Sequence, residues 1–286
     1  MDAGLGKRLI WQRDRVRLDD IVFRLELAKS DDWDLGDRCF VFYKTKELVD
    51  QYLQFWSSRE GLPTEHILEI GIYDGGSVAF WFENFQPRKH VAIDLERKDD
   101  SEYFKWYVAS RGLQDRLKTY WGVDQADGER LREIVHREFS GPLDLIVDDA
   151  SHLYAPTMKS FETLFPLVRP GGLYIIEDWG WAYDQHWMGP GSPLSTQKIA
   201  LSKFVIELLE AVGSARGVIN SLIACGGFAA IERGARTVES DTPFKVRDEI
   251  LRYPRRRKPL HIPAVARVKM HIPRLLLPGR RRRRRA

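Results

Sequence analysis

Cysteines and long apolar runs are scarce in this chain, and each shortage excludes a class of protein. The 286 residues include two cysteines, Cys39 and Cys225, which stand far apart without a Cys-x-x-Cys spacing. A disulfide framework or a zinc ribbon is therefore not indicated, and a reducing compartment is favoured. No run approaches the ~18 apolar residues of a membrane-spanning helix, since the longest candidate is the short segment 221–231. The first 20 residues lack the apolar core of a signal peptide, so we expect a cytoplasmic protein.

The net charge of +4 hides an uneven distribution along the chain. Residues 241–286 hold 16 Lys or Arg against 3 acidic residues, a net of +13, so residues 1–240 carry −9. Six prolines lie beyond Ser240, and arginines fill positions 280–285. Such a segment cannot bury enough apolar surface to fold alone. We expect a basic, Pro/Arg-rich, disordered tail over residues 240–286.

The basic tail predicts contact with an anionic surface. Leu275, Leu276 and Leu277 stand among arginines, a pattern typical of peripheral segments that meet anionic lipid. We therefore expect peripheral attachment to the inner membrane surface. Nucleic acid is the alternative partner for the arginines, through phosphate contacts, but the acidic body argues against it. The sequence leaves homo-oligomer formation open.

Strand and helix patterns alternate through the centre of the chain. Strands are expected over residues 66–70, 90–95, 117–121, 143–147 and 172–176, helices over 44–56, 77–84, 128–138, 155–167 and 195–212, and a terminal hairpin over 217–224 and 227–232. This alternation predicts an α/β fold: a doubly wound, mostly parallel, Rossmann-like sheet with an antiparallel edge hairpin and ligands at the carboxyl ends of its strands. We assign residues 1–60 to an N-terminal helical cap region and residues 61–239 to the main domain.

Acidic residues end two of the expected strands. Asp148 and Asp149 close one run and are followed by His152, while Glu177 and Asp178 close the next. The carboxyl ends of neighbouring parallel strands lie at one edge of a sheet, so Asp149, Glu177 and Asp178 should meet, with His152 just beyond. Carboxylates grouped in this way suit a hard divalent cation.

A glycine-rich turn follows the strand expected at residues 66–70. It reads Glu69-x-Gly71-x-x-x-Gly75-Gly76-Ser77. The pattern differs from the dinucleotide fingerprint Gly-x-Gly-x-x-Gly, and its opening carboxylate would repel a pyrophosphate but not a cationic cofactor. The glycines allow close backbone approach, and Ser77 can cap the next helix. Asp94, which ends the next strand, is placed to accept hydrogen bonds from ribose hydroxyls.

The glycine turn with Asp94 resembles motif I and the following acidic residue of class I S-adenosylmethionine methyltransferases. The resemblance implies that S-adenosylmethionine is the cofactor. Its binding set is then Glu69, Gly71, Gly75, Ser77, Asp94, Asp124, Gln125 and Asp148. Asp124 and Gln125 are expected beside the adenine, with roles in a surface turn as the alternative. For Asp148, the alternative is a hydrogen bond to the loop backbone.

Three segments narrow this resemblance. They are Asp148-Asp149-Ala150-Ser151-His152, Phe165-Pro166-Leu167-Val168-Arg169-Pro170-Gly171-Gly172 and Ile176-Glu177-Asp178. They are similar to the metal-dependent macrolide sugar O-methyltransferases of the mycinamicin type and to their rhamnosyl methyltransferase and cephalosporin hydroxylase-like relatives. The resemblance implies Mg²⁺ held by Asp149 and Asp178, Glu177 as a ligand or a neighbour of the ligands, and His152 as general base. The expected reaction methylates a sugar hydroxyl of a glycoside, glycolipid or polyketide.

Two other activities of the same fold are weighed against sugar methylation. A catechol-type methyltransferase is expected to use a lysine base, and no lysine stands near Asp149 in the sequence. A hydroxylase would need an iron site of two histidines and one carboxylate, which is not evident. The loop over residues 179–191 holds Trp179, Trp181, Tyr183 and Trp187. These aromatic rings could stack on a sugar or pack on the body as a lid, and the sequence does not decide between the two.

Overall fold

The structure, a computed structural model, describes residues 9–12, 15–25, 39–59, 61–184, 194, 197–238 and 243–251. All of them belong to one compact unit that ends at Leu251. The basic tail from residue 252 onward lies outside the described residues, so its expected disorder stays a prediction. Within the described part, no helix is both long enough and apolar enough to cross a membrane.

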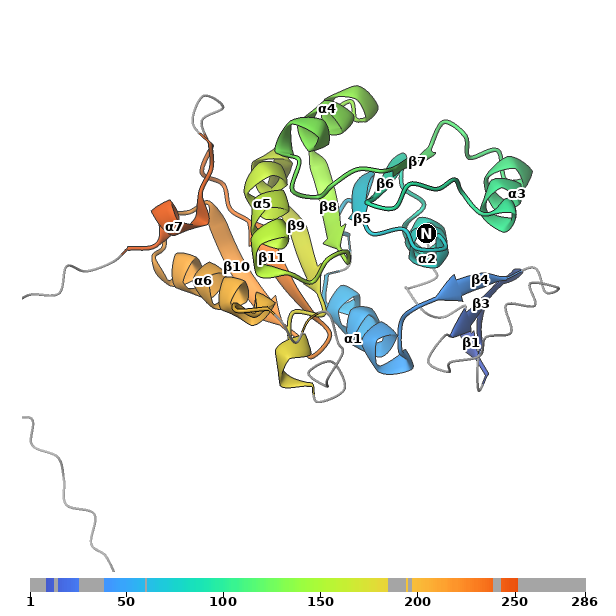
Figure 1. Cartoon of the computed structure of the whole chain (residues 1–286), viewed down its shortest axis with the longest axis horizontal. Helices are drawn as coiled ribbons and strands as arrows, with labels where there is room; N and C mark the ends of the chain where they lie inside the picture. The colour runs from blue at the N-terminus through green and yellow to red at the C-terminus, as the bar shows by residue number, and fades with distance from the viewer. Residues whose placement is uncertain are drawn as a thin grey trace, which may run out of the picture. The chain divides into compact units, whose positions relative to one another are not determined.

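A seven-stranded sheet forms the centre of the described unit (Figure 1). Its strands are β5 (His66–Ile70), β6 (Lys89–Asp94), β7 (Leu117–Trp121), β8 (Leu143–Asp148), β9 (Val168–Glu177), β10 (Ile219–Ala224) and β11 (Phe228–Arg233). Their order is β10-β11-β9-β8-β5-β6-β7; β5 to β9 run parallel, and β11 is antiparallel to both of its neighbours. The expected doubly wound sheet with an antiparallel hairpin is confirmed, with β11 inserted between β9 and β10. The chain order reverses between β5 and β8, which is where open α/β sheets bind ligands.

Helices cover both faces of this sheet (Figure 1). On one side lie α1 (Lys46–Ser57), α2 (Gly76–Phe85) and α3 (Glu102–Ser110), and on the other α4 (Gly128–Glu138), α5 (Tyr154–Leu164) and α6 (Leu201–Gly213). Ile67 and Ile175 pack towards the first group, whereas their neighbours Leu68 and Ile176 pack towards the second. Because side chains alternate along a strand and both faces are covered, these strands are continuous apolar runs. The polar residues that line the ligand cavity therefore lie at or just beyond the ends of these strands.

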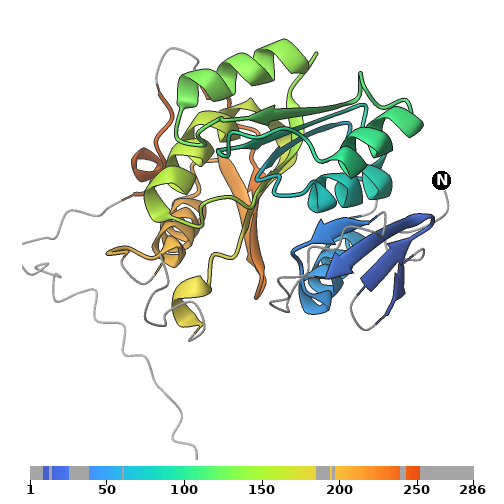
Figure 2. The same ribbon diagram turned by 45° about the vertical axis from the view of Figure 1, so that its right-hand side comes forward.

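The described N-terminal region is not a helical cap, so our expectation for residues 1–60 is wrong in that part. It forms a second sheet of β1 (Leu9–Trp11), β2 (Arg15–Leu18), β3 (Ile21–Leu25) and β4 (Phe40–Phe42), followed by α1 (Figure 2). Val16 and Leu18 are buried with Ile21 and Phe23 in the cluster beneath α2 and α3. Burial at every second residue is the strand period, and in segments of three to five residues it gives too short a sequence signal to recognise.

Two boundaries near the carboxyl end also differ from expectation. The helix expected over residues 195–212 begins at Leu201, after a turn in which Gln197 N–H donates to the Leu194 carbonyl. The expected tail begins too early, because residues 243–251 are placed against the body and include α7 (Val246–Glu249). Phe244 and Val246 are buried there, and Lys245 pairs with Glu162 of α5 at 2.6 Å. This segment needs the body to bury its apolar side chains, which the tail composition alone did not reveal.

Candidate active site and cation-binding cluster

A single cavity of about 590 Å³ lies at the carboxyl ends of the parallel strands. Among the expected site residues, it is lined by Gly71, Ser77, Asp94, Asp124, Gln125, Asp149, His152 and Asp178. The structure thus brings the expected cofactor turn and the expected cation site into one space. Four expected residues do not line the cavity: Glu69, Gly75, Asp148 and Glu177. Each of these four has a different place in the fold.

Gly71 joins the two halves of the site through the backbone. It has a φ of +106°, and a Cβ there would lie 2.2 Å from the Asp149 carbonyl oxygen. The Asp149 N–H donates to the Ile70 carbonyl at 2.8 Å. Only glycine allows this approach, because any side chain would collide with the loop that carries Asp149. Gly71 therefore has a packing role as well as a place in the cavity wall.

Glu69 and Gly75 lie outside the cavity lining and support the glycine turn by hydrogen bonding and packing. Glu69 is fully buried; its Oε1 accepts a hydrogen bond from the Ser77 hydroxyl, and its Oε2 lies 3.2 Å from His90 Nε2. Gly75 has a φ of +85°, and a Cβ there would lie 2.3 Å from the Phe104 ring. Direct contact of these two residues with a cofactor, as expected from the sequence, is not what the structure shows. Glu69 acts on the cavity through Ser77, which lines it.

Asp94 closes the same turn with its carboxylate. Its Oδ2 accepts from the N–H groups of Ile72 and Tyr73 at 2.8 and 3.1 Å, and its Oδ1 accepts from the Glu96 N–H at 2.9 Å. A carboxylate has about four acceptor positions, so one remains for a ligand in the cavity. Asp94 therefore orders the turn and still faces the space where a ribose could lie.

Asp148 belongs to a buried polar network, not to the cavity wall. It accepts hydrogen bonds from Tyr174 at 2.6 Å, Ser160 at 2.7 Å and the Gln125 amide at 3.3 Å. Burial raises the pKa of Asp148 to about 6, although the Tyr174 and Ser160 hydrogen bonds oppose that shift. The Gln125 Oε1 in turn accepts from the Ser151 N–H at 3.1 Å. Asp148 therefore fixes Gln125, and Gln125 fixes the loop that leads to His152, so the expected cofactor contact of Asp148 is corrected.

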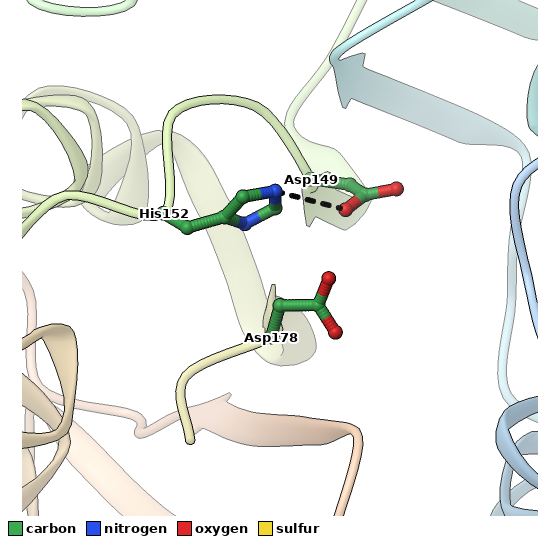
Figure 3. A group of neighbouring side chains, drawn as sticks. All are labelled: Asp149, His152 and Asp178. Atoms are coloured by element: carbon green, nitrogen blue, oxygen red, sulfur yellow. Dashed lines mark ion pairs between the residues drawn. The ribbon is translucent and has the colours of Figure 1, made fainter. Parts of the chain in front are cut away.

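The chemistry-bearing cluster consists of Asp149, His152 and Asp178 (Figure 3). Asp149 and His152 come from the loop after β8, and Asp178 from the end of β9. One ligand atom from each lies within 4.8 Å of the others, and His152 Nε2 is 3.9 Å from Asp149 Oδ1. His152 and Asp178 have positive φ angles of 53° and 51°. Left-handed backbone at non-glycine residues is costly and gathers at functional sites, so the fold holds these two side chains against local preference.

The aromatic loop after β9 packs mainly on the body in its described part. Trp181 is buried and donates from Nε1 to the His152 carbonyl at 2.7 Å. Trp179 donates to the Cys225 carbonyl at 2.9 Å, whereas Tyr183 is 72% exposed. Trp187 lies outside the described residues. Trp181 therefore supports the strained backbone of His152, whereas the Tyr183 hydroxyl donates to Ser202 Oγ at 3.2 Å and its ring does not line the cavity.

Lys44 is a site residue that sequence reasoning missed. It lies two residues after the end of β4, and its Nζ donates to Asp149 Oδ2 at 2.9 Å and to both oxygens of Glu177 at 2.8 and 2.7 Å. Burial alone would lower the pKa of Lys44, but the charges of Asp149 and Glu177 raise it above its ordinary value. No lysine lies near Asp149 in the sequence, but Lys44 contacts Asp149 in the folded protein, so our statement about the absence of a nearby lysine is wrong for the structure. The available signal was a lysine at the end of an apolar strand run, the same position that revealed the acids.

Glu177 is turned away from the open cluster. Its side chain is 1% exposed, and Oε1 also accepts from the Tyr52 hydroxyl at 2.8 Å. Both oxygens are engaged by partners from the N-terminal part of the chain, an arrangement that agrees with the expected place of Glu177 as a neighbour of the ligands, while its alternative role as a ligand stays a prediction. That part also supplies a wall of the cavity through Val41 and Tyr43, and β4 is tied to the glycine turn by a hydrogen bond from the Val41 N–H to Asp74.

The cluster fits a divalent cation by its donor chemistry. Two carboxylates and one imidazole within 4.8 Å offer oxygen and nitrogen ligands of the kinds that Mg²⁺ and Mn²⁺ accept. Among the described residues, no second histidine joins the group, so the two-histidine, one-carboxylate iron site of a hydroxylase is not formed there. Asp178 is exposed at the mouth, and desolvation by the cavity walls still raises its pKa.

A family model described as a methyltransferase domain matches residues 68–179. The mycinamicin VI 2''-O-methyltransferase of Micromonospora griseorubida is 35% identical over 165 residues, which cover 55% of this chain and 34% of that protein. Demethylmacrocin O-methyltransferase of Streptomyces fradiae is 34% identical over 153 residues, covering 50% of this chain and 35% of that protein. The solved structure of the MycE methyltransferase with Mg, SAH and mycinamycin VI is 30% identical, with a TM-score of 0.48, and covers 68% of this chain and 50% of that one.

These comparisons confirm the resemblance to macrolide sugar O-methyltransferases, and the match to the methyltransferase-domain model is limited to residues 68–179. The chain spans about a third of the length of the curated relatives it matches. The region of similarity includes the glycine turn, Asp94 and the loop from Asp148 to His152.

Proposed function

We propose that this protein is an S-adenosylmethionine-dependent, divalent-metal-assisted O-methyltransferase that acts on a sugar hydroxyl of a glycoside, glycolipid or polyketide. One observation carries the proposal: a single cavity joins the glycine turn and Asp94 to Asp149, His152 and Asp178. Methyl transfer to oxygen needs a cofactor, an oriented hydroxyl and a proton acceptor within reach of one another. The cavity offers residues for all three.

The cofactor half of the cavity is built around Asp94. Its remaining acceptor position would receive a ribose hydroxyl, while Gly71 and Ser77 form the wall next to it. Asp124 lines the cavity, and its carboxylate Oδ1 accepts a hydrogen bond from the Ala126 N–H at 2.8 Å. Gln125 lines the cavity with both ends of its amide engaged, so it would bound the adenine as a fixed surface.

The acceptor half is formed by the acidic cluster. Asp149 and Asp178 would hold the cation, and His152 would take the proton of the hydroxyl at Nε2. When bound, S-adenosylmethionine supplies an activated methyl group, and the cation supplies positive charge that lowers the pKa of a hydroxyl beside it. A histidine serves as base because its ordinary pKa lies near neutral pH. Trp181 would keep the imidazole in place through the His152 carbonyl.

The acceptor class is supported by the names of the relatives and by the cavity. Both curated relatives named above are O-methyltransferases, and one of them acts on mycinamicin VI. Tyr43 is 58% exposed and contacts the Tyr73 ring at a centroid distance of 5.8 Å, and both line the cavity. Exposed aromatic faces of this kind stack on sugar rings.

The catechol-type alternative is not favoured by Lys44. A lysine base must be able to lose its proton, whereas Lys44 has three carboxylate oxygens at 2.7–2.9 Å and a raised pKa. Its side chain is 2% exposed, and it would have to break two ion pairs to reach a substrate. We therefore keep His152 as the base.

The basic tail supports a second proposal about location. The net charge of +13 over residues 241–286 would draw a cytoplasmic enzyme to the anionic inner membrane surface and to acceptors held there. We leave homo-oligomer formation open and hold nucleic acid as the weaker partner, because the rest of the chain is acidic.

The proposed function is tested by binding and turnover together. Calorimetry should show S-adenosylmethionine binding to the intact protein, and mass spectrometry should show a gain of one methyl on a glycoside from a panel. Asp149→Asn, Asp178→Asn or chelation should abolish turnover and leave cofactor affinity nearly unchanged. Asp50→Asn is the matched control, because Asp50 is an exposed carboxylate that pairs with Lys46. Turnover by the chelated protein, or absence of cofactor binding, would overturn the proposal.

A further inference from the structure

Exposed aliphatic side chains gather on and beside α6. Outside the cavity, the described part of the chain exposes six large aliphatic side chains, and four of them belong to this region. Ile206 and Leu209 lie on α6, and Ile199 precedes the helix by two residues. Leu251 lies beside the end of α6, where its N–H donates to Ser214 Oγ at 2.8 Å. Single exposed apolar residues are ordinary, but a group of them on one element marks an interaction surface.

The helix α6 carries apolar residues on both of its faces. The inner face buries Leu201, Phe204 and Leu208, and the helix packs beside α5 and α7 (Figure 1). Ile206 and Leu209 are neighbours on the outer face, three positions apart, and are 47% and 56% exposed. A surface helix of a globular domain normally carries charged and polar residues on that face. The outer face of α6 therefore has the composition of a contact surface, and the described part of the chain does not cover it.

The charges next to this face indicate which partner it meets. Lys203 and Glu210 are exposed on the helix and balance each other. The chain continues from Leu251 into residues 252–286, which contain 14 Lys or Arg and no acidic residue. Binding to anionic lipid grows with the apolar area that is buried and with the attraction of Lys and Arg to the headgroups, so an apolar face joined to a cationic segment suits a lipid surface. A nucleic acid would engage the cations but leave the apolar face in water, and a second copy would bring a second cationic segment to the same end of α6.

We infer that the outer face of α6 is a docking surface for an anionic lipid bilayer, with Ile206 and Leu209 entering the interface beside the headgroups that hold the basic segment. This inference rests on the peripheral membrane location in the proposed function and goes beyond it, because it assigns a part of the folded body to the contact. The two contributions differ physically: the attraction of the cations is screened by salt, whereas the burial of apolar surface is not.

The position of α6 connects this surface to the cavity. The Tyr183 hydroxyl donates to Ser202 Oγ of α6 at 3.2 Å, and Tyr183 ends the short 3-10 helix η2 (Trp181–Tyr183). Trp181 of the same short helix lines the cavity, and so does Pro156 of α5, which packs beside α6. Docking through α6 would therefore hold this wall of the cavity near the lipid, which favours a glycolipid among the three acceptor classes.

The experiment measures how the full chain partitions onto vesicles of phosphatidylglycerol and phosphatidylcholine in equal parts, at low and at high salt. Ile206→Gln/Leu209→Gln should lower the partition coefficient by about tenfold or more at both salt concentrations, because two apolar side chains no longer enter the interface. Glutamine is a good helix former, so α6 should be kept. The matched control is Ile10→Gln/Ile223→Gln, which should bind within about twofold of wild type. Ile10 lies on β1, and Ile223 pairs with Ala230 on the face of the sheet opposite α6.

A second measurement reports the contact directly. An environment-sensitive fluorophore on Leu209→Cys, in a Cys225→Ser background because Cys39 is buried, should shift to the blue when anionic vesicles are added. The same fluorophore on Ile10→Cys should not shift.

Three results would overturn the inference. If the α6 variant binds vesicles as wild type does, or the fluorophore at position 209 does not shift, the tail alone makes the contact and only the peripheral location stands. If the wild type dimerises in analytical ultracentrifugation and the α6 variant does not, a second copy covers the face. If the wild type binds no vesicles, the membrane location fails together with this inference, while methyl transfer to a soluble glycoside is tested separately. Should the α6 variant not fold, the fluorophore decides.

Discussion

His152 offers the most decisive test of the proposed mechanism. We expect His152→Asn to slow methyl transfer by about 10²–10⁴, the usual contribution of a positioned base, which corresponds to about 2.7–5.5 kcal/mol in the activation barrier. Asparagine is chosen because His152 has a φ of 53°, a left-handed conformation that asparagine tolerates better than alanine does. An alanine would add strain of roughly 1–2 kcal/mol to the loop and confuse loss of the base with loss of structure.

The assay separates a base from a metal ligand. Single-turnover methyl transfer gives the rate of the chemical step, and Mn²⁺ and S-adenosylmethionine affinities are measured on the same protein. A base variant keeps both affinities and recovers part of its rate at high pH, because a hydroxyl whose pKa the cation lowers can lose its proton to solvent. Trp181→Phe is a matched control that removes the 2.7 Å hydrogen bond to the His152 carbonyl and should cost only about two- to tenfold.

Two outcomes would refute the reasoning about His152. Full activity of His152→Asn at neutral pH would leave the imidazole with a structural role. Loss of Mn²⁺ affinity by about a hundredfold or more would make it the third ligand of the cluster, since a lost ligand costs several kcal/mol, and another group would have to take the proton.

Three further predictions follow from the same geometry. Asp94→Asn should weaken S-adenosylmethionine binding by about 1.5–3 kcal/mol in calorimetry while keeping an acceptor for the turn, and unchanged affinity would remove the ribose contact. Burial raises the pKa of Asp148 from 3.8 to about 6, so the folded state binds the Asp148 proton more tightly than the unfolded state does. The folded state is therefore more stable at low pH, by about 3 kcal/mol relative to high pH. This contribution is complete below pH ~4 and is lost as the pH rises through 6. Urea unfolding from pH 4 to 8 should show that slope in wild type but not in Asp148→Asn. Truncation after Leu251 removes the basic tail but keeps the segment that packs on α5. The truncated protein should keep turnover on a soluble acceptor and lose salt-sensitive sedimentation with anionic vesicles. An unfolded truncated protein, or duplex DNA that outcompetes the vesicles for the full chain, would contradict this prediction.

Local sequence determined the central sheet and where its polar residues emerge. Strands buried on both faces must be apolar runs, so Asp94, Asp149 and Asp178 at their ends could be recognised and placed at one edge without any tertiary information. The glycine turn could also be recognised from the sequence. Its backbone needs φ values that residues other than glycine avoid, so the glycines themselves mark it. The small N-terminal sheet was not, since its short strands carry too few alternating residues to be distinguished from other short apolar segments.

Only the tertiary structure decided which of the acids face the cavity. Asp148 and Asp149 are neighbours in sequence, but one points into a network with Tyr174 and Ser160 and the other into the open cluster, since successive side chains at a strand end take opposite directions. Glu177 and Asp178 are also neighbours with different surroundings. The Glu177 side chain is paired with Lys44, a residue 133 positions away, whereas Asp178 lines the cavity. Pairing across such distances depends on how the N-terminal sheet packs against the domain, and no local pattern in the sequence records it.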